Sequence, residues 1–343
     1  MFNYEWKIEN GYPGNGTKAN NLKVFSTFAC GGGSSMGYKL AGFTVIGAND
    51  IDPQMEKVYK ANHNPNIYLR CPIGDLISME LPKELYNLDI LDGSPPCSTF
   101  SVAGLREKSW KKNKKFKEGQ AKQVLSDLFF DWIKLVDKLQ PKIAIAENVK
   151  GMIMGNAKAY TQTIVKKLED IGYDVQLFLL NSGNMGVPQK RERVFFICRR
   201  RNLNFNKLKL SFNEKSIILS EVIKKVKIPI GKVLSPAYSK WWFAMGEKSG
   251  SFGKTHPKGS FFNTVKCNPF KVINTIIATT GAKLTHWNYP NELSNEVLGL
   301  CGSYPTDYKY LDLDPKYLIG MSVPPVMVAQ IAHQIYVQWF KLG

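Results

Sequence analysis

The feature that most constrains the fold of this chain is a regular alternation of strand-like and helix-like segments between residues 20 and 198. Short apolar runs typical of buried strands lie at 23–28, 43–48, 88–92, 142–146, 174–180 and 193–198, and helical spacing of apolar residues fits 54–62, 121–139 and 159–171. This alternation predicts an α/β fold in which helices cover both faces of a doubly wound, mostly parallel sheet.

Unusual residues follow four of these strands. A glycine cluster begins at Cys30 after the first strand, Asp50 follows the second, and Cys97 and Glu147 follow the third and fourth. Because ligands of doubly wound sheets bind at the carboxyl ends of the strands, we expect the four features to converge at one edge of the sheet. The sequence therefore predicts a single functional site at that edge.

The glycine cluster and Asp50 together are typical of a nucleotide site. Glycines let a ligand approach the backbone, and an acidic residue after the next strand accepts hydrogen bonds from ribose hydroxyls. The pattern is not G-x-G-x-x-G and lacks the Lys-Ser/Thr pair of a phosphate loop, so it fits a phosphate-free nucleoside such as S-adenosylmethionine slightly better than a dinucleotide. A glycine turn without any ligand is the alternative.

Cys97 has the setting of a nucleophile. Pro95 and Pro96 fix two φ angles directly before it, which holds the thiol rigidly at the end of a strand. Most cysteines are buried and inert, but this one lies next to the predicted cofactor site.

Three charged residues extend the candidate site. Glu147 follows the apolar run Ala-Ile-Ala, where a carboxylate without a partner is costly. Arg191 and Arg193 precede the last strand at a spacing that directs both side chains to the same side. An ordinary surface ion pair is the alternative for each residue taken singly.

Composition narrows the class of partner. The chain has 343 residues and a net charge of +18. Such an excess of positive charge points to a polyanionic partner such as nucleic acid, and a solvated, lysine-rich surface is the alternative. Its six cysteines form no C-x-x-C pair and its four histidines have no metal-ligand spacing, so we expect no metal site. No apolar run approaches the ~20 residues of a membrane span, and the first residues do not resemble a secretory signal.

The regular alternation ends after Cys198. Residues 199–280 contain three consecutive arginines, Trp241-Trp242 and a Gly/Ser/Lys stretch at 246–260, which indicate a smaller β- and loop-rich domain, and 322–340 is expected to form a final helix. We therefore predict one domain from 20–198 plus 316–343 and a smaller domain with a hinge from 199–315. Trp241-Trp242 is expected to form the small domain's own core more readily than a ligand surface.

The motifs resemble those of the cytosine-5 DNA methyltransferase family of the bacterial and phage type, over about 24–198 and again over about 271–340. The matching segments are the cofactor loop Phe28–Gly33, the ribose segment Asn49–Asp52, the adenine turn Gly74–Leu76, the catalytic turn Gly93–Cys97, Glu147-Asn148-Val149, Gln189–Arg193 and the last cofactor segment Gly320–Pro324. The sequence departs from the family pattern at Cys30, where glycine is usual, and at Ile51, where an aromatic residue is common.

This resemblance implies a Rossmann-like S-adenosylmethionine methyltransferase domain with a target-recognition domain, in which roughly 199–280 reads the sequence. It implies transfer of a methyl group from S-adenosylmethionine to C5 of a flipped-out cytosine, through a covalent bond between the Cys97 thiolate and C6, with S-adenosylhomocysteine as the product. The implied catalytic residues are Cys97, Glu147, Arg191 and Arg193. The implied cofactor residues are Phe28, Ala29, Cys30, Gly31, Gly33, Asp50, Ile51, Asp75, Leu76, Pro96, Leu128, Ser322 and Val323.

The resemblance also implies double-stranded DNA as the partner, action as a monomer in the cytoplasm, a bacterial or phage-encoded origin, no membrane association and, in restriction–modification systems, a cognate nuclease. Residues 98–117, with their lysine cluster, are expected to form a loop that closes on the substrate. The alternatives are a tRNA cytosine-5 methyltransferase, a catalytically dead DNA-binding protein on the same scaffold, and an NAD-dependent oxidoreductase, which would leave Pro95-Pro96-Cys97 unexplained.

Overall fold

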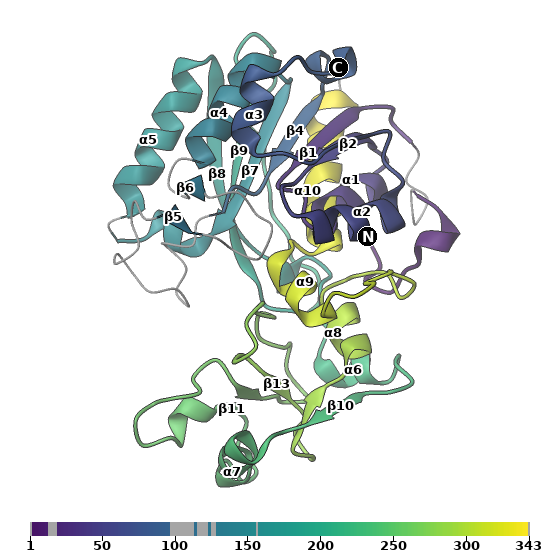
Figure 1. Ribbon diagram of the computed structural model, residues 1–343, viewed down its shortest axis with the longest axis vertical. Helices are drawn as coiled ribbons and strands as arrows, with labels where there is room; N and C mark the ends of the chain where they lie inside the picture. Colours follow the sequence, from purple (N-terminus) through teal and green to yellow (C-terminus); the bar gives the residue numbers. More distant parts are fainter. Residues whose placement is uncertain are drawn as a thin grey trace.

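A seven-stranded sheet forms the centre of the larger lobe (Figure 1). The computed structural model describes residues 2–12, 19–96, 128–155 and 157–341, and the backbone of two short strands, β5 (Asn113–Lys114) and β6 (Gln123–Val124). In spatial order the sheet contains β3 (Ile67–Leu69), β2 (Thr44–Asn49), β1 (Lys23–Thr27), β4 (Ile90–Gly93), β7 (Ile143–Val149), β9 (Glu192–Arg200) and β8 (Tyr173–Asn181). Only β9 runs antiparallel to its neighbours in this sheet, so the predicted α/β class with a mostly parallel sheet is confirmed.

Helices cover both faces of this sheet. On one face, α1 (Gly33–Leu40) packs against α10 (Pro325–Ile335), and α2 (Pro53–His63) lies beside α1. On the other face lie α3 (Ile73–Ser78), α4 (Leu128–Leu139) and α5 (Ala157–Asp170). Alternate residues of each strand enter the two cores: Ile90 and Ile145 pack with α10, whereas Leu91 and Ala146 pack with α4.

The structure corrects two of the predicted helices. Of the helix expected at 121–139, the structure describes α4 from Leu128 to Leu139, whereas Gln123 and Val124 pair with Lys114 and Asn113 as β6 and β5. The helical spacing of apolar residues did not reveal that pairing. The final helix expected at 322–340 is present but begins at Pro325 as α10 and ends in the π-helical turn η6 (Tyr336–Phe340); a separate helix, α9 (Pro315–Met321), precedes it.

Within the described ranges, Pro315–Phe340 alone meets the length and hydropathy of a membrane span, and 78% of its most apolar window is buried inside the protein. A core helix of a globular domain has the same properties, so this stretch does not indicate a membrane.

The smaller lobe lies below the first in Figure 1 and is built on a five-stranded sheet. Its strands, in spatial order, are β10 (Ile230–Val233), β14 (Asn291–Leu293), β13 (Leu284–Thr285), β12 (Val265–Lys266) and β11 (Gly250–Ser251), accompanied by α6 (Leu219–Ile223), α7 (Pro236–Ala244) and α8 (Asn295–Cys301). Trp242 is buried with Leu234, Met245 and Phe252, and its Nε1 donates to His286 O at 2.9 Å. Trp242 thus belongs to the lobe's own core, as expected.

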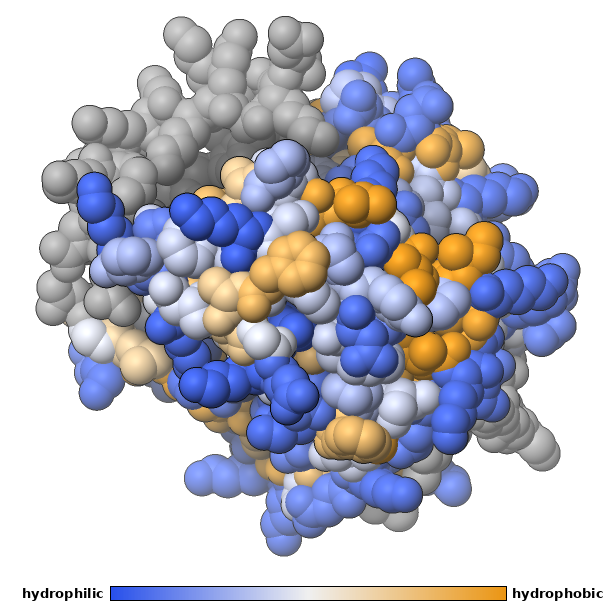
Figure 2. All heavy atoms as spheres, turned by 90° about the horizontal axis from the view of Figure 1, so that it is seen from below, coloured by the Kyte–Doolittle hydropathy of each residue, from blue (hydrophilic) through white to orange (hydrophobic). Residues whose placement is uncertain are grey.

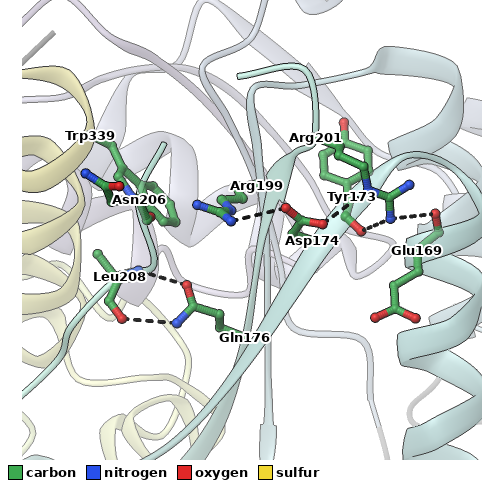
Figure 3. A network of polar contacts seen from close by, with 9 residues as sticks. All are labelled: Glu169, Tyr173, Asp174, Gln176, Arg199, Arg201, Asn206, Leu208 and Trp339. Atoms are coloured by element: carbon green, nitrogen blue, oxygen red, sulfur yellow. Dashed lines mark hydrogen bonds and ion pairs between the residues drawn. The ribbon is translucent and has the colours of Figure 1, made fainter. Parts of the chain in front are cut away.

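The chain does not leave the larger lobe immediately after β9. The Gln176 side chain on β8 donates from Nε2 to Leu208 O at 3.0 Å and accepts from Leu208 N at 2.8 Å, and Trp339 Nε1 donates to Asn206 O at 2.8 Å (Figure 3). Asp174 accepts from both Arg199 and Arg201 at 3.2 Å. The segment after β9 is therefore fastened along the large sheet, and the predicted boundary at 199 lies inside β9.

Candidate active site

A buried ion pair lies at the carboxyl end of β7. Glu147 Oε1 and Arg193 Nε are 2.8 Å apart, and their side chains are only 12% and 14% exposed. The two residues come together because β7 pairs with β9 in a register that sets Val149 opposite Arg193, so that Glu147 is a diagonal neighbour of Arg193 on the same face. Burial lowers the pKa of Arg193, and the charge of Glu147 raises it. The sequence-predicted association of these two residues is present.

The turn that leads to Cys97 is tied to the same strand. Asn148, the residue after Glu147, donates from Nδ2 to Pro95 O at 3.0 Å. Cys97 itself lies outside the described residues, as do the residues 98–112 of the expected closing loop. Pro96 is the last described residue before it and is half-buried. The Pro-Pro turn and the carboxylate are therefore held next to each other by one side-chain amide.

Asp92 is a buried carboxyl group that the sequence analysis did not single out. It is 4% exposed and lies on β4 directly beside Ile145 of β7, on the face to which Glu147 also points. It accepts from Ser26 Oγ at 2.9 Å and from Tyr38 OH at 3.1 Å. Burial raises the pKa of Asp92 to about 7, and the charge of Glu147 acts in the same direction.

Arg191 has a different environment from Arg193. It is 2% exposed, and its two terminal nitrogens donate to Ile276 O at 3.1 Å and Gly320 O at 3.0 Å. Gln189 similarly donates to Cys301 O and accepts from Ile276 N. These contacts tie the start of β9 to Ile276 and to α9. The catalytic role that the motif predicts for Arg191 stays a prediction.

A cleft of about 510 Å³ opens beside this ion pair. It is lined by residues of both lobes, among them Lys150, Lys190 and Arg193 from the large lobe and Thr275 from the segment that follows β12. Lys190 N donates to Ile273 O at 2.9 Å, which fixes one wall of the cleft to the other. Its basic lining suits an anionic partner.

The predicted cofactor loop joins β1 to α1 in a conformation that residues with side chains rarely adopt. Phe28 and Cys30 have φ values of 51° and 50°, and Gly32, which precedes α1, has a φ of 87°. Ala29 N donates to Asn49 O at 3.0 Å, and Cys30 N donates to Asp50 Oδ2 at 2.8 Å. The loop and the end of β2 are thus joined, as the sequence predicted.

The Asp50 carboxylate keeps acceptor capacity in this arrangement. It receives the N–H groups of Cys30 and Asp52, whereas a carboxylate offers about four lone-pair positions. Burial raises the pKa of Asp50, and the two N–H groups lower it. The remaining lone-pair positions suit hydrogen bonds from ribose hydroxyls, and the cofactor role of Asp50 stays a prediction.

The structure places six other predicted cofactor residues in three different environments. Leu76 and Leu128 are buried in one hydrophobic core cluster, against which the partly buried Phe28 packs. Ser322 and Val323 lie against the glycine cluster: a Cβ added at Gly33 would be 2.5 Å from Val323 O and 3.0 Å from the Ser322 side chain. Ile51 is half-buried after β2, and Asp75 is exposed in α3; no described contact joins either to the loop.

Sequence reasoning also missed Tyr308, whose hydroxyl donates to Gly31 O at 2.5 Å. The contact joins residues 277 positions apart, and no local pattern indicates it. Within the described part of the chain, no cluster of His, Cys, Asp and Glu could hold a metal ion.

Comparison with known proteins identifies the family. The family model described as C-5 cytosine-specific DNA methylase matches residues 22–337. The chain belongs to this family. The match extends over both lobes and includes the loop, the Glu147–Arg193 pair and the Ser322–Val323 segment.

Bacterial relatives agree with this assignment. The chain is 34% identical over 192 residues to the type II methyltransferase M.FnuDI of Fusobacterium nucleatum, a match that covers 56% of this chain and 51% of the relative. It is 33% identical over 202 residues to the type II methyltransferase M.NgoPII of Neisseria gonorrhoeae, covering 59% and 54%. The matches therefore span about half the length of these relatives.

Solved structures share the fold. A prophage-encoded E. coli protein described as a DNA modification methyltransferase superposes with a TM-score of 0.68 at 18% identity, over 93% of this chain and 99% of that one. DNMT2 of Spodoptera frugiperda superposes with a TM-score of 0.64 at 16% identity, over 92% and 100%.

Proposed function

We propose that this chain is a DNA (cytosine-5-)-methyltransferase that acts on a cytosine extruded from duplex DNA. The observation that carries the proposal is the buried Glu147–Arg193 pair, which Asn148 ties to the Pro95-Pro96 turn before Cys97. An ionisable acid, a cation and a thiol held at one strand edge are what this reaction requires. The family and the type II relatives support DNA over tRNA as the substrate.

The reaction begins with activation of the ring. The Cys97 thiolate adds to C6 of cytosine, forming a sulfur–carbon bond, while the C5–C6 π electrons shift towards N3 and C5 becomes nucleophilic. N3 takes up a proton from water as negative charge develops, Glu147 stabilises the protonated N3 and the exocyclic amine by hydrogen bonding, and Arg193 holds O2. Positive charge near the thiol also favours the thiolate.

The later steps return the enzyme to its starting state. S-adenosylmethionine, when bound, supplies an electrophilic methyl group, which C5 takes up, and S-adenosylhomocysteine is released. A base then removes the C5 proton, the C5–C6 double bond re-forms, the thiolate leaves, and the N3 proton returns to water. Asp50 and the glycine loop would hold the ribose, and the cluster of Phe28, Leu76 and Leu128 would hold the purine.

A cytosine stacked in a duplex is out of reach of a strand-edge thiol. Extrusion costs a few kcal/mol, which phosphate contacts can offset. The basic cleft between Lys150, Lys190 and Thr275 supports this part of the proposal. We further infer that the small lobe reads the target sequence, that the enzyme acts as a monomer in the cytoplasm, and that a cognate nuclease is a candidate partner in vivo.

The proposal is tested with a duplex that carries 5-fluorocytosine, in which the C5 substituent cannot be removed as a proton. The wild-type protein should form a covalent adduct that peptide mapping assigns to Cys97. Cys97→Ser should lose both adduct and turnover, and Cys71→Ser, a partly exposed cysteine outside the proposed machinery, should retain both. Methylation by Cys97→Ser at the wild-type rate would refute the mechanism.

Donor binding provides a separate test. Asp50→Ala should weaken binding of S-adenosylmethionine about ten- to a hundredfold in calorimetry, because a hydrogen bond to a charged group contributes roughly 1.5–3 kcal/mol. Unchanged affinity would mean that the ribose binds elsewhere.

A further inference from the structure

The glycine turn between β1 and α1 is strained, and the residues around it must maintain its shape. Phe28 and Cys30 occupy the left-handed region, which is unfavourable for residues with a side chain. Such conformations persist only where the surrounding structure determines them. The groups packed against the turn therefore decide how its backbone faces a ligand.

Three elements contact this turn from different directions. Asp50 at the end of β2 accepts from Cys30 N, and Tyr308 donates to Gly31 O. The third contact comes from His63, the last residue of α2: a Cβ added at Gly32 would lie 2.1 Å from its Nε2. The imidazole thus occupies the space directly against the Gly32 backbone.

His63 is itself fixed on every other side. It is 7% exposed, and its ring stacks on Tyr59 with the ring centroids 4.2 Å apart. Tyr59 OH in turn donates to Ser35 Oγ of α1 at 2.8 Å. The ring therefore has one orientation, with Nε2 towards the turn.

Lys39 of α1 determines which ring nitrogen carries the proton. Its Nζ lies 3.3 Å from His63 Nδ1 and also donates to His63 O at 3.3 Å. A charged lysine has donors only, so Nδ1 is the acceptor and the proton resides on Nε2. Burial, and then the charge of Lys39, lowers the pKa of His63 well below its usual value, so the ring is neutral.

The Nε2–H group has no hydrogen-bond partner of normal geometry among the described residues. A buried donor of this kind is costly unless it has a partner or a role. The backbone of Gly31 and Gly32 is the group that faces it.

We propose that His63 is a positioning residue for the methyl donor: with its tautomer set by Lys39, it supports the Gly31–Gly32 backbone and holds the strained turn in the shape that receives the donor. The inference rests on the proposed function, since it assumes that the donor binds this turn. His63 contacts neither donor nor cytosine in this role. Its loss should therefore weaken donor binding and raise the KM for the donor while kcat changes little.

The first test measures binding of S-adenosylhomocysteine to the full chain by calorimetry. His63→Leu, which fills similar space without a donor, should raise the Kd about tenfold, and His63→Gln, whose amide keeps an N–H group near Nε2, should restore it to within about threefold. Lys39→Met should weaken binding about as much as His63→Leu, whereas Lys60→Met, an exposed lysine of α2, should leave it unchanged.

The second test does not depend on any variant folding. Long-range ¹H–¹⁵N spectra of the wild-type protein should show His63 as the neutral Nε2–H tautomer. An Nδ1–H tautomer, or wild-type affinity in His63→Leu, would overturn the inference. If the wild-type protein binds no S-adenosylhomocysteine at all, the proposed function fails; if it binds and the variants bind equally well, only the role of His63 fails.

Discussion

The buried carboxyl of Asp92 should make the stability of this protein depend on pH in an unusual direction. Asp92 is 4% exposed, it accepts hydrogen bonds from the hydroxyl groups of Ser26 and Tyr38, and burial raises its pKa from 3.8 to about 7. The folded protein therefore keeps the Asp92 proton over a range of pH in which the unfolded chain has lost it. Over that range, from about pH 4 to pH 7, stability falls as pH rises.

The magnitude follows from the shift. A rise of about three pKa units corresponds to roughly 4 kcal/mol at 1.36 kcal/mol per unit, an upper figure for one buried group. This contribution is fully present below about pH 4 and fully lost above about pH 7. Asp92→Asn has nearly the same shape and cannot titrate. The difference in free energy of unfolding, variant minus wild type, should therefore rise by up to about 4 kcal/mol between pH 4 and pH 8.

Urea unfolding at a series of pH values measures this difference, provided that the dependence of the free energy of unfolding on urea concentration is the same in both proteins. The control is Asp89→Asn, since Asp89 directly precedes β4 and, unlike Asp92, pairs with a lysine, Lys142, at 2.7 Å. That variant loses an ion pair and should be less stable than the wild type at pH 8. The reasoning about Asp92 is wrong if the difference between Asp92→Asn and the wild type is the same at pH 5 and pH 8.

Three further predictions concern packing and anchoring. Gly33→Ala should abolish measurable binding of S-adenosylhomocysteine, since its Cβ would lie 2.5 Å from the backbone of Val323, whereas Gly281→Ala, with no neighbour closer than 3.9 Å, should bind normally in the same calorimetric assay. Arg191→Met should lower the free energy of unfolding by roughly 2–5 kcal/mol, because two buried carbonyls lose their donor; an unchanged urea midpoint would contradict the anchoring role. Ser294→Ala should cost about 1 kcal/mol by the same measurement, since Ser294 Oγ accepts from Val297 N as the N-cap of α8.

The strand-edge site was predictable from the sequence because its residues follow strands. Apolar runs fix where β1, β2, β4 and β7 end, and topology then brings the residues after them together. Arg193 was found through its motif and its position at the start of a predicted strand. These inferences need only local periodicity and the geometry of a parallel sheet.

The supporting contacts were not predictable in the same way. Tyr308 reaches Gly31 from the other end of the chain, and His63 looks like an ordinary last residue of a helix until its ring is placed against Gly32. Asp92 follows buried apolar residues, as many unremarkable polar residues do at strand ends. The roles of Arg191 and Arg193 also differ because Arg191 precedes the strand and meets two carbonyls, which no side-chain spacing reveals.

The route of the chain after β9 decides where a specificity graft should be joined. β9 starts beside the carboxyl end of β7, where the candidate site lies, and ends beside the start of β7. The chain must therefore run back along the sheet before it enters the small lobe. That return leg runs through Asn206 and Leu208 to Glu214, whose N–H donates to Asn184 O near the start of β9. A hybrid joined at residue 199 would replace this segment and lose the packing of Leu208 in the core between the sheet and α10. A graft joined after Glu214 would exchange the small lobe, which we propose reads the target sequence, and keep the recipient's own large lobe unchanged.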